Sequence, residues 1–359
     1  MVDFDNLSII NSTLASSANL TAIICQPRHE PYDTYAFVLM LVVSPLICVY
    51  GGIGSLLATT VFMKKKMRKF PSSWILAALA LSDFVLLVVS LLFCMEALAD
   101  YVEDHLLQRL WLQAAISLYY VGCAARMSGD YLTVAVTIER WASTDMTRRS
   151  ICKRKRVKLW IVGIWTFCAL FKLPKLFELE LIENPECTGM NRYTLFFSSL
   201  GMNELYSLIY SVWLSMFLEI IVPFILLFVL NILLTYRSLR KSNDDFEDGG
   251  GSMVTLPLRS HVQMHMYSLK RREANRMIIM IVALFLICTV PDFALTLTEA
   301  VNLDWLLKHG QFYSIAGYTI QLVIVSNSAL NFTIYLVFGR QFRKELISNF
   351  RYIRKCLHT

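Results

Sequence analysis

The sequence predicts an all-α membrane protein, in which seven transmembrane helices form a bundle and a short amphipathic eighth helix follows. Hydrophobic residues make up 56% of the 359 residues, and charged residues make up only 17%. Soluble domains carry about 25% charged residues. The sequence also contains seven apolar segments, each of which reaches the roughly 20 residues that a helix needs to cross a bilayer. Such long, continuous apolar runs are typical of helices and not of barrel strands.

The pattern of hydropathy divides the chain into three regions. Residues 1–34 form a polar tail, residues 35–338 form the transmembrane domain, and residues 339–359 form the amphipathic helix with a short tail. Within the domain, the polar and glycine-rich segment at about 241–268 is expected to be a flexible inner loop. The expected spans are 35–63, 72–98, 110–140, 158–177, 205–235, 276–299 and 311–338.

The N-terminal tail carries three Asn-x-Ser/Thr sequons, at Asn6, Asn11 and Asn19. Sequons so close together predict a glycosylated tail on the outer side of the membrane. Since no apolar signal segment precedes the first span, that span is expected to act as the signal anchor.

The positions of Lys and Arg predict the same orientation. The segments 64–69, 140–158, 237–276 and 340–355 hold five, eight, eight and six of the 34 Lys and Arg residues. Segments on the inner side of a membrane carry the excess of positive charge. The N-terminus is therefore expected outside and the C-terminus inside, in the plasma membrane.

The sequence after the seventh span predicts a helix that lies on the inner leaflet. Phe342, Leu346, Ile347 and Phe350 share one helical face, and basic residues lie opposite. Such a helix binds membrane lipids through its apolar face. Cys356 either carries palmitate or stays unmodified, and the sequence leaves both open.

A first group of polar residues lies deep within the apolar spans. Asp83 is midway along the second span, and Asn327, Ser328 and Asn331 share a face of the seventh. Polar side chains at this depth face the interior of the bundle. A carboxylate opposite two amides and a hydroxyl can bind a small cation or a water network. A packing network without an ion is the alternative.

The third span ends in Glu139-Arg140-Trp141, and charges at the mouth of a membrane helix usually mark a functional site unless they form only a solvated pair. Together with Leu-Ala-Leu-Ser-Asp83 and Asn-Phe-Thr-Ile-Tyr335, this sequence resembles the motifs of rhodopsin-like G-protein-coupled receptors. The resemblance covers about residues 35–350. It implies that Glu139, Arg140 and Tyr335 form the switch that couples to a heterotrimeric G protein, and that the Asp83 group forms the family's sodium and water network.

A narrower resemblance points to the FMRFamide and myosuppressin-type neuropeptide receptors of invertebrates. The segments Asn-Phe-x-Ile-Tyr, Gly-Arg-Gln-Phe-Arg343 and Leu-Pro-Lys-Leu-Phe-Glu178 carry it. The chain also departs from the family pattern at several positions. Phe332 replaces the proline of the seventh helix, Thr289 replaces the tryptophan of the sixth, and Gly129 replaces the serine of the third that belongs to the cation site.

The outer half of the bundle holds a second group of charged and polar residues, which imply a hydrated cavity or mutual pairing. Gly122 stands where monoamine receptors carry an Asp, so the resemblance favours a different ligand. A peptide with a basic residue and a polar C-terminus suits acidic groups beside one buried Arg. An internal Arg126–Glu219 ion pair that binds nothing is the alternative. The expected ligand-pocket residues are Arg126, Glu219, Asp292, Glu299 and Gln321.

The family's third helix usually begins with a Cys that is bonded to the second outer loop, but Ala115 occupies that place here. Cys187 lies in the second outer loop, and Cys25 lies about ten residues before the first span. Exposed cysteines on the oxidising outer face tend to pair. We therefore expect a Cys25–Cys187 disulfide, with two unpaired thiols as the alternative.

These patterns predict a receptor in which an extracellular ligand, a neuropeptide by the resemblance, shifts the helix bundle and activates a heterotrimeric G protein. The sequence shows no catalytic set, phosphate-binding loop or metal-ligand spacing. We therefore expect no enzyme activity, no cofactor, no metal site and no nucleic-acid partner. A membrane transporter or channel that uses the buried charges as an ion path is the alternative. Inverted repeats or broken helices would favour that class, and the sequence shows neither.

Overall fold

The computed structural model describes residue 35 and residues 38–99, 105–143, 154–183, 193–247 and 258–357. Three groups of expected features lie outside these residues: the tail of residues 1–34, the glycosylation sites and the disulfide. Their residues are Asn6, Asn11, Asn19, Cys25 and Cys187.

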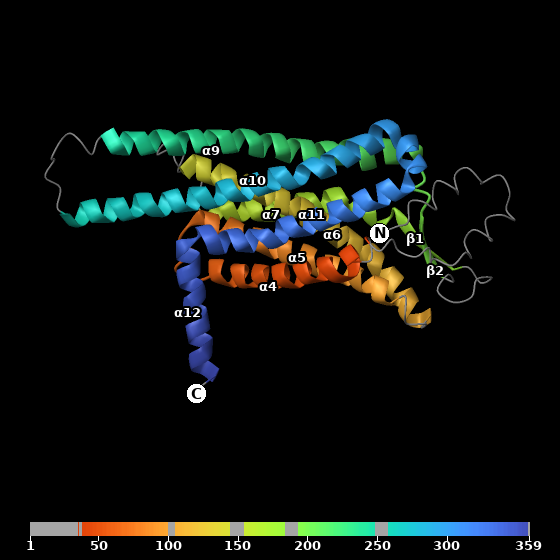
Figure 1. The fold of residues 1–359 in the computed structure, drawn as a ribbon, viewed down its shortest axis with the longest axis horizontal. Helices are drawn as coiled ribbons and strands as arrows, with labels where there is room; N and C mark the ends of the chain where they lie inside the picture. The colour runs from red at the N-terminus through yellow and green to blue at the C-terminus, as the bar shows by residue number, and fades with distance from the viewer. Residues whose placement is uncertain are drawn as a thin grey trace.

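The described chain is a bundle of long helices that run along one common direction (Figure 1). These helices coincide with the seven apolar segments of the sequence, and a further helix follows the last of them. The helical elements are η1 (Leu39–Val43), α4 (Ser44–Phe62), α5 (Pro71–Ala99), α6 (His105–Ser143), α7 (Arg154–Lys172), η3 (Leu173–Leu176), α8 (Glu204–Tyr206), η5 (Ser207–Leu214), η6 (Met216–Ile221), α9 (Val222–Glu247), α10 (Leu258–Lys308), α11 (Gly310–Phe338) and α12 (Arg340–Leu357).

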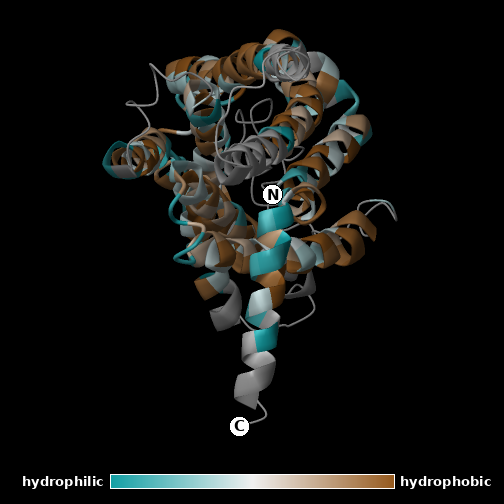
Figure 2. Ribbon diagram, turned by 90° about the vertical axis from the view of Figure 1, so that its left-hand side faces the viewer, coloured by the Kyte–Doolittle hydropathy of each residue, from teal (hydrophilic) through white to brown (hydrophobic). Residues whose placement is uncertain are grey.

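The outer surface of this bundle is apolar, as a lipid environment requires. Leu46, Leu159 and Ile287 are large apolar side chains with exposed fractions of 67%, 71% and 71%. Hydrophobic residues also dominate the bundle helices in Figure 2. Within the described residues, six helical stretches are long and apolar enough to cross a membrane. The seventh, α6, is less apolar because it carries Arg126 and Asp130, and it packs in the interior against α5, α7, α9 and α10.

Two strands mark one end of the bundle, which we call the hairpin end. Strands β1 (Leu179–Glu183) and β2 (Tyr193–Phe197) pair antiparallel, with Leu179 opposite Phe197 and Glu183 opposite Tyr193. The backbone N–H of Ser198 donates to the carbonyl of Glu178 at 2.9 Å and closes the base of the pair. The opposite end, from which α12 departs, is the Arg140 end (Figure 1). The sequence analysis did not predict this hairpin.

The packing of α4 against α11 depends on a close approach that only glycine permits. A Cβ atom on Gly54 would lie 2.5 Å from the ring of Phe332. Phe332 is 8% exposed, and its ring makes edge contacts with Tyr50 and Phe342 at centroid distances of 6.2 Å. The residue that replaces the family's proline therefore fills the groove that Gly54 leaves open.

The helices that flank the long inner segment continue further than the sequence predicted. Helix α9 extends to Glu247 and α10 begins at Leu258, so both ends of the segment expected to be flexible at about 241–268 are helical. Helix α10 contains Pro291 and a break at Asn302, where φ is −147° and ψ is 60°. A proline inside a helix removes one backbone hydrogen bond and permits a hinge.

Helix α12 leaves the bundle at a steep angle and matches the predicted eighth helix (Figure 1). Phe342 and Leu346 are buried, with exposed fractions of 2% and 8%, whereas Ile347 on the same predicted face is 50% exposed. Glu345 anchors the helix to the α4–α5 connection, because Lys64 and Lys66 lie 3.6 and 3.3 Å from its carboxylate.

Candidate functional site

The three residues expected to form the coupling switch lie at the Arg140 end. Glu139 is 3% exposed, and its carboxylate is 3.4 Å from the Nε of Arg140. The guanidinium of Arg140 also donates a hydrogen bond to Ser72 on α5. Arg140 is thus held by its own helix and by α5 in this conformation. Two charged residues of α10, Arg271 and Glu273, have side chains outside the described set.

Tyr335 lies apart from Arg140 in the contacts that the structure describes. Its side chain is 1% exposed and packs edge-on against Phe62 and Phe342, with ring centroids 5.1 and 5.7 Å away. Its hydroxyl has no hydrogen-bond partner among the described residues. The aromatic packing therefore fixes the ring while the hydroxyl stays available for a partner in another conformation.

The expected cation and water network assembles in the middle of the bundle. Asn331 donates from Nδ2 to the Asp83 carboxylate at 2.9 Å, and Ser328 lines a cavity beside that carboxylate. Asn327 lines the same cavity. A Cβ atom on Gly129 would lie 3.9 Å from Oδ1 of Asp83, so the third helix approaches the carboxylate with bare backbone. Asp83, Asn331 and Ser328 are each about 5% exposed or less.

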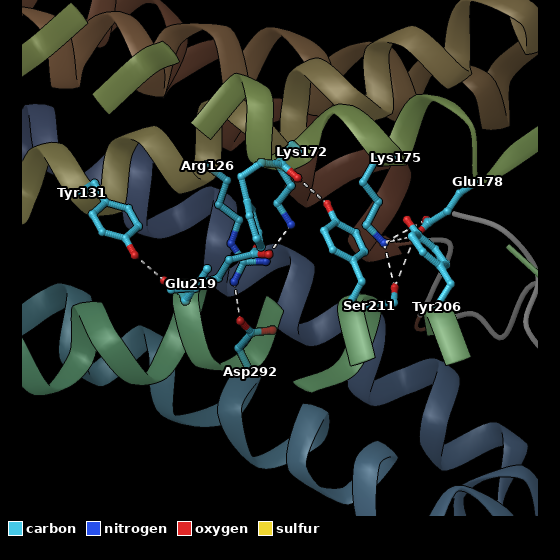
Figure 3. A network of polar contacts seen from close by, with 12 residues as sticks. Arg126, Tyr131, Lys172, Lys175, Glu178, Tyr206, Ser211, Glu219 and Asp292 are labelled. Atoms are coloured by element: carbon cyan, nitrogen blue, oxygen red, sulfur yellow. Dashed lines mark hydrogen bonds and ion pairs between the residues drawn. The ribbon is translucent and has the colours of Figure 1, made fainter. Parts of the chain in front are cut away.

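Toward the hairpin end, two ion pairs inside the bundle join four helical elements. Arg126 of α6 pairs with Asp292 of α10, and Lys172 of α7 pairs with Glu219 of η6 (Figure 3). The Arg126–Glu219 pair that the sequence left open is therefore wrong for this conformation. The Lys172 side chain is only 4% exposed, and that of Glu219 is 19% exposed. Sequence analysis did not place Lys172 in the site, although a lysine at the end of an outward-directed span was a usable signal.

The local structure of the fifth span places Glu219. Elements η5 and η6 are π-helical, so the chain turns more widely just before Pro223 than an α-helix does. Such π-helical turns often occur at functional sites. The hydroxyl of Tyr131 donates to the Leu218 carbonyl at 2.8 Å and ties this turn to α6. Periodicity along the sequence cannot reveal such a change of helical register.

A third ion pair anchors the hairpin to the bundle. The amine of Lys175 is 2.8 Å from both carboxylate oxygens of Glu178 and 3.0 Å from the hydroxyl of Ser211. Tyr206 donates to the same carboxylate at 3.0 Å (Figure 3). Because β1 begins at the next residue, this network fixes where the hairpin leaves the helices.

Two further residues of the expected ligand pocket lie apart from these pairs. Glu299 of α10 accepts a hydrogen bond from Tyr313 of α11 at 2.9 Å. Gln321 lies on α11 with a half-buried side chain. Neither residue lines the cavity that contains Arg126.

One cavity connects the Asp83 network with the charged residues. It leaves about 40 Å³ for water, which is room for about three molecules. In this conformation such a space holds waters or a small hydrated ion, and a larger group fits only if side chains at its edge move. Its polar lining is formed by Asp83, Asn327, Ser328, Asn331, Arg126, Asp130, Thr133, Glu219 and Thr289.

Comparison with known families accounts for this combination of seven helices and buried polar motifs. The family described as 7 transmembrane receptor (rhodopsin family) matches residues 54–335, which is most of the chain. The chain belongs to this family. It is a receptor rather than an enzyme, and the family signals through G proteins. The resemblance seen in the sequence motifs is thereby confirmed at the level of the family.

Several relatives of this receptor are peptide receptors. It is 24% identical to the FMRFamide receptor of Drosophila melanogaster over 336 residues, which is 89% of this chain and 56% of the relative. The chain thus spans little more than half the length of the fly protein. It is also 24% identical to neuromedin-U receptor 1 of Mus musculus over 397 residues, which is 98% of this chain and 87% of the relative. It is 27% identical to the thyrotropin-releasing hormone receptor of Homo sapiens over 166 residues, which is 44% of this chain and 38% of the relative.

The departures of this receptor from the family pattern have visible consequences near the cavity. Thr289 donates its hydroxyl hydrogen to the Phe285 carbonyl at 2.8 Å and lines the cavity. The Thr289 side chain is far smaller than the family's tryptophan, and its hydroxyl finds its hydrogen-bond acceptor on its own helix. The polar space above Asp83 therefore extends to the charged residues.

Proposed function

We propose that this receptor lies in the plasma membrane, binds a peptide from outside at its hairpin end and activates a heterotrimeric G protein at its Arg140 end. The charge cluster inside the bundle, formed by Arg126, Asp292, Lys172 and Glu219, is the observation that carries the proposal. Ionic groups at this depth are costly unless they serve a ligand or hold a conformation. The cluster also lies beside the hinge at Pro291.

The relatives support a peptide as the ligand. Receptors for FMRFamide, neuromedin-U and thyrotropin-releasing hormone are among the similar proteins. The pocket chemistry agrees, because Glu219 and Asp292 provide anions for a basic residue and Arg126 provides donors for a polar terminus. Glu299 and Gln321, nearer the end of the bundle, would contact a more exposed part of such a peptide.

The Arg140 end has the properties of a surface for the G protein. Glu139 and Ser72 hold Arg140 in the described conformation, and their release would free the guanidinium for a partner. Tyr335 carries a hydroxyl that could join Arg140 after the helices move. A ligand that prefers the rearranged bundle would thus promote coupling by population shift.

The arrangement of charge supports an orientation with the hairpin end and residues 1–34 outside. The Arg140 end carries the basic residues of the α4–α5 connection and of α12, as the inner side of a membrane protein does. With this orientation α12 would lie against the lipids of the inner leaflet. Residues 35–338 would form the receptor domain, and residues 339–359 the inner helix and tail.

The test is a screen of amidated peptides against receptor reconstituted with heterotrimeric G proteins, with nucleotide exchange as the readout. Peptide-dependent exchange that is lost in Arg140→Ala supports the proposal. The rival class is a transporter or channel that uses Asp83 and the charged cavity as an ion path. Peptide-independent ion or solute flux through reconstituted vesicles, without nucleotide exchange, would favour the rival.

A further inference from the structure

Asp130 is an acid in the cavity that neither ion pair uses. It lies on α6 and lines the same cavity as Arg126, Glu219 and Asp83. Among the described residues, no hydrogen bond or ion pair engages its carboxylate. A carboxylate removed from bulk water is costly without a partner. The position of Asp130 therefore requires an explanation.

Arg126 is the cation that can reach Asp130. The two residues are four positions apart on α6, the spacing at which helical side chains meet. Arg126 thus lies between two acids, one across the bundle on α10 and one on its own helix. In the described conformation it is paired with Asp292.

We propose that Arg126 is a two-position switch that a cationic group of the ligand operates. In the resting receptor, Arg126 pairs with Asp292 and ties α6 to α10. When the ligand's cation takes Asp292, Arg126 turns to Asp130, and the tie between the two helices is lost. This inference rests on the proposed function and assigns a ligand chemistry and a mode of control to the same site.

The balance of charge favours a cationic ligand group. The pairs Arg126–Asp292 and Lys172–Glu219 are each neutral, so Asp130 leaves the cluster with one excess negative charge whenever it is ionised. One incoming cation would complete three pairs. An incoming anion would instead compete with the acids for Arg126 and Lys172, and it would leave Asp130 without a partner.

The exposure of the side chains indicates which pair opens. The Arg126 side chain is 34% exposed, so its guanidinium can move within hydrated space. The Lys172 side chain is 4% exposed and has no second acid beside it among the described ion pairs. The Lys172–Glu219 pair is therefore expected to stay closed while Arg126 changes partners.

The position of Asp292 explains how this exchange reaches the rest of α10. Asp292 follows Pro291 directly, at the point where the helix lacks a backbone hydrogen bond. The tie from Arg126 restrains α10 at its hinge. Its release would let the part of α10 toward the Arg140 end move relative to α6, which is the change that G-protein coupling requires.

The experiment measures basal nucleotide exchange without ligand, per receptor at the cell surface. Asp292→Asn removes the resting partner, so basal exchange is expected to rise about tenfold, a bias of about 1.4 kcal/mol. Asp130→Asn alone removes the second position of Arg126, so the balance shifts toward the resting pair and basal exchange is expected to fall about tenfold. A simple restraint at Asp292 makes no use of Asp130, so unchanged basal exchange in Asp130→Asn would overturn the switch.

Glu178→Gln is the matched control, because it also converts an ion-paired carboxylate to an amide, while its hydrogen-bond partners Lys175, Tyr206 and Ser211 lie on elements other than α6 and α10. Its basal exchange is expected to match the wild type. If the receptor responds to peptide but Asp292→Asn reaches the surface without raised basal exchange, the switch is refuted and the proposed function is not. A receptor in which neither peptide nor Asp292→Asn produces exchange would refute the proposed function as well.

A peptide pair tests the charge of the ligand. An active amidated peptide is compared with an analogue in which citrulline replaces its arginine, which keeps the shape but removes the charge. The analogue is expected to lose about tenfold in potency on the wild type and little on Asp292→Asn. An equal loss on both receptors would show that the cation binds elsewhere and would overturn its role at Asp292.

Discussion

Replacing Gly129 with Ser is expected to create a strong cation site beside Asp83. The family's cation site has a serine at this position, and its replacement by glycine removes one oxygen ligand. A Cβ atom at Gly129 would lie 3.9 Å from Oδ1 of Asp83 and 3.8 Å from Leu79 Cδ1, both ordinary contact distances. The new side chain therefore fits without displacing a neighbour, and its hydroxyl can turn toward the carboxylate.

The size of the effect follows from one added contact to a charged group, which contributes about 1.5–3 kcal/mol. Sodium affinity is therefore expected to rise by about tenfold or more. The assay is agonist binding in sodium chloride and in choline chloride at equal ionic strength. The wild type is expected to show little sodium dependence, whereas Gly129→Ser should bind agonist more weakly in sodium. Asp83→Asn in the same background should abolish the difference.

Gly163→Ser provides a matched control for this experiment. Gly163 is also a helical glycine, but a Cβ atom there would have no neighbour within 4 Å. Its replacement is expected to leave sodium dependence unchanged. A strong sodium effect in the wild type, removed by Asp83→Asn, would refute the reasoning, because it would mean that another oxygen already replaces the missing serine.

Three further predictions concern other parts of the receptor. Arg140→Ala is expected to abolish nucleotide exchange while surface expression persists, and normal exchange by this variant would exclude its role in coupling. Gly54→Leu is expected to destabilise the receptor by about 1–3 kcal/mol or more, because the new side chain overlaps Phe332; a melting curve in detergent measures this, and an unchanged midpoint would contradict it. Non-reducing peptide mapping is expected to recover Cys25 linked to Cys187, and a free Cys25 thiol would disprove that bond.

The sequence predicts the fold well because the membrane imposes a simple rule. Each span must be long and apolar, so hydropathy alone locates the helices, and Pro174 explains why α7 gives way to a 3₁₀ turn near the predicted end of the fourth span. The amphipathic pattern after the seventh span predicts helix α12 equally directly. The strands β1 and β2 were missed because their short polar and apolar alternation lies in a loop between two much stronger signals.

The pairing of the buried charges could not be predicted in the same way. Sequence spacing gives the depth of a residue and, to about one turn, the face of its helix. Arg126 could therefore be placed near both Glu219 and Asp292, but the rotation of each helix decides which of them it meets. The π-helical turns before Pro223 change that rotation, and they place Glu219 against Lys172 instead.

The departures from the family pattern are related to one another through the space that they open or fill. Gly129 and Thr289 are both small, and both line the cavity that joins Asp83 to Arg126. A serine and a tryptophan at these positions would take up volume between the two polar groups. Their absence keeps the space continuous, so the proposed change of partner at Arg126 would act on Asp83 across a hydrated space rather than across packed side chains. The charges within this bundle thus lie where its smaller residues leave room for their hydration.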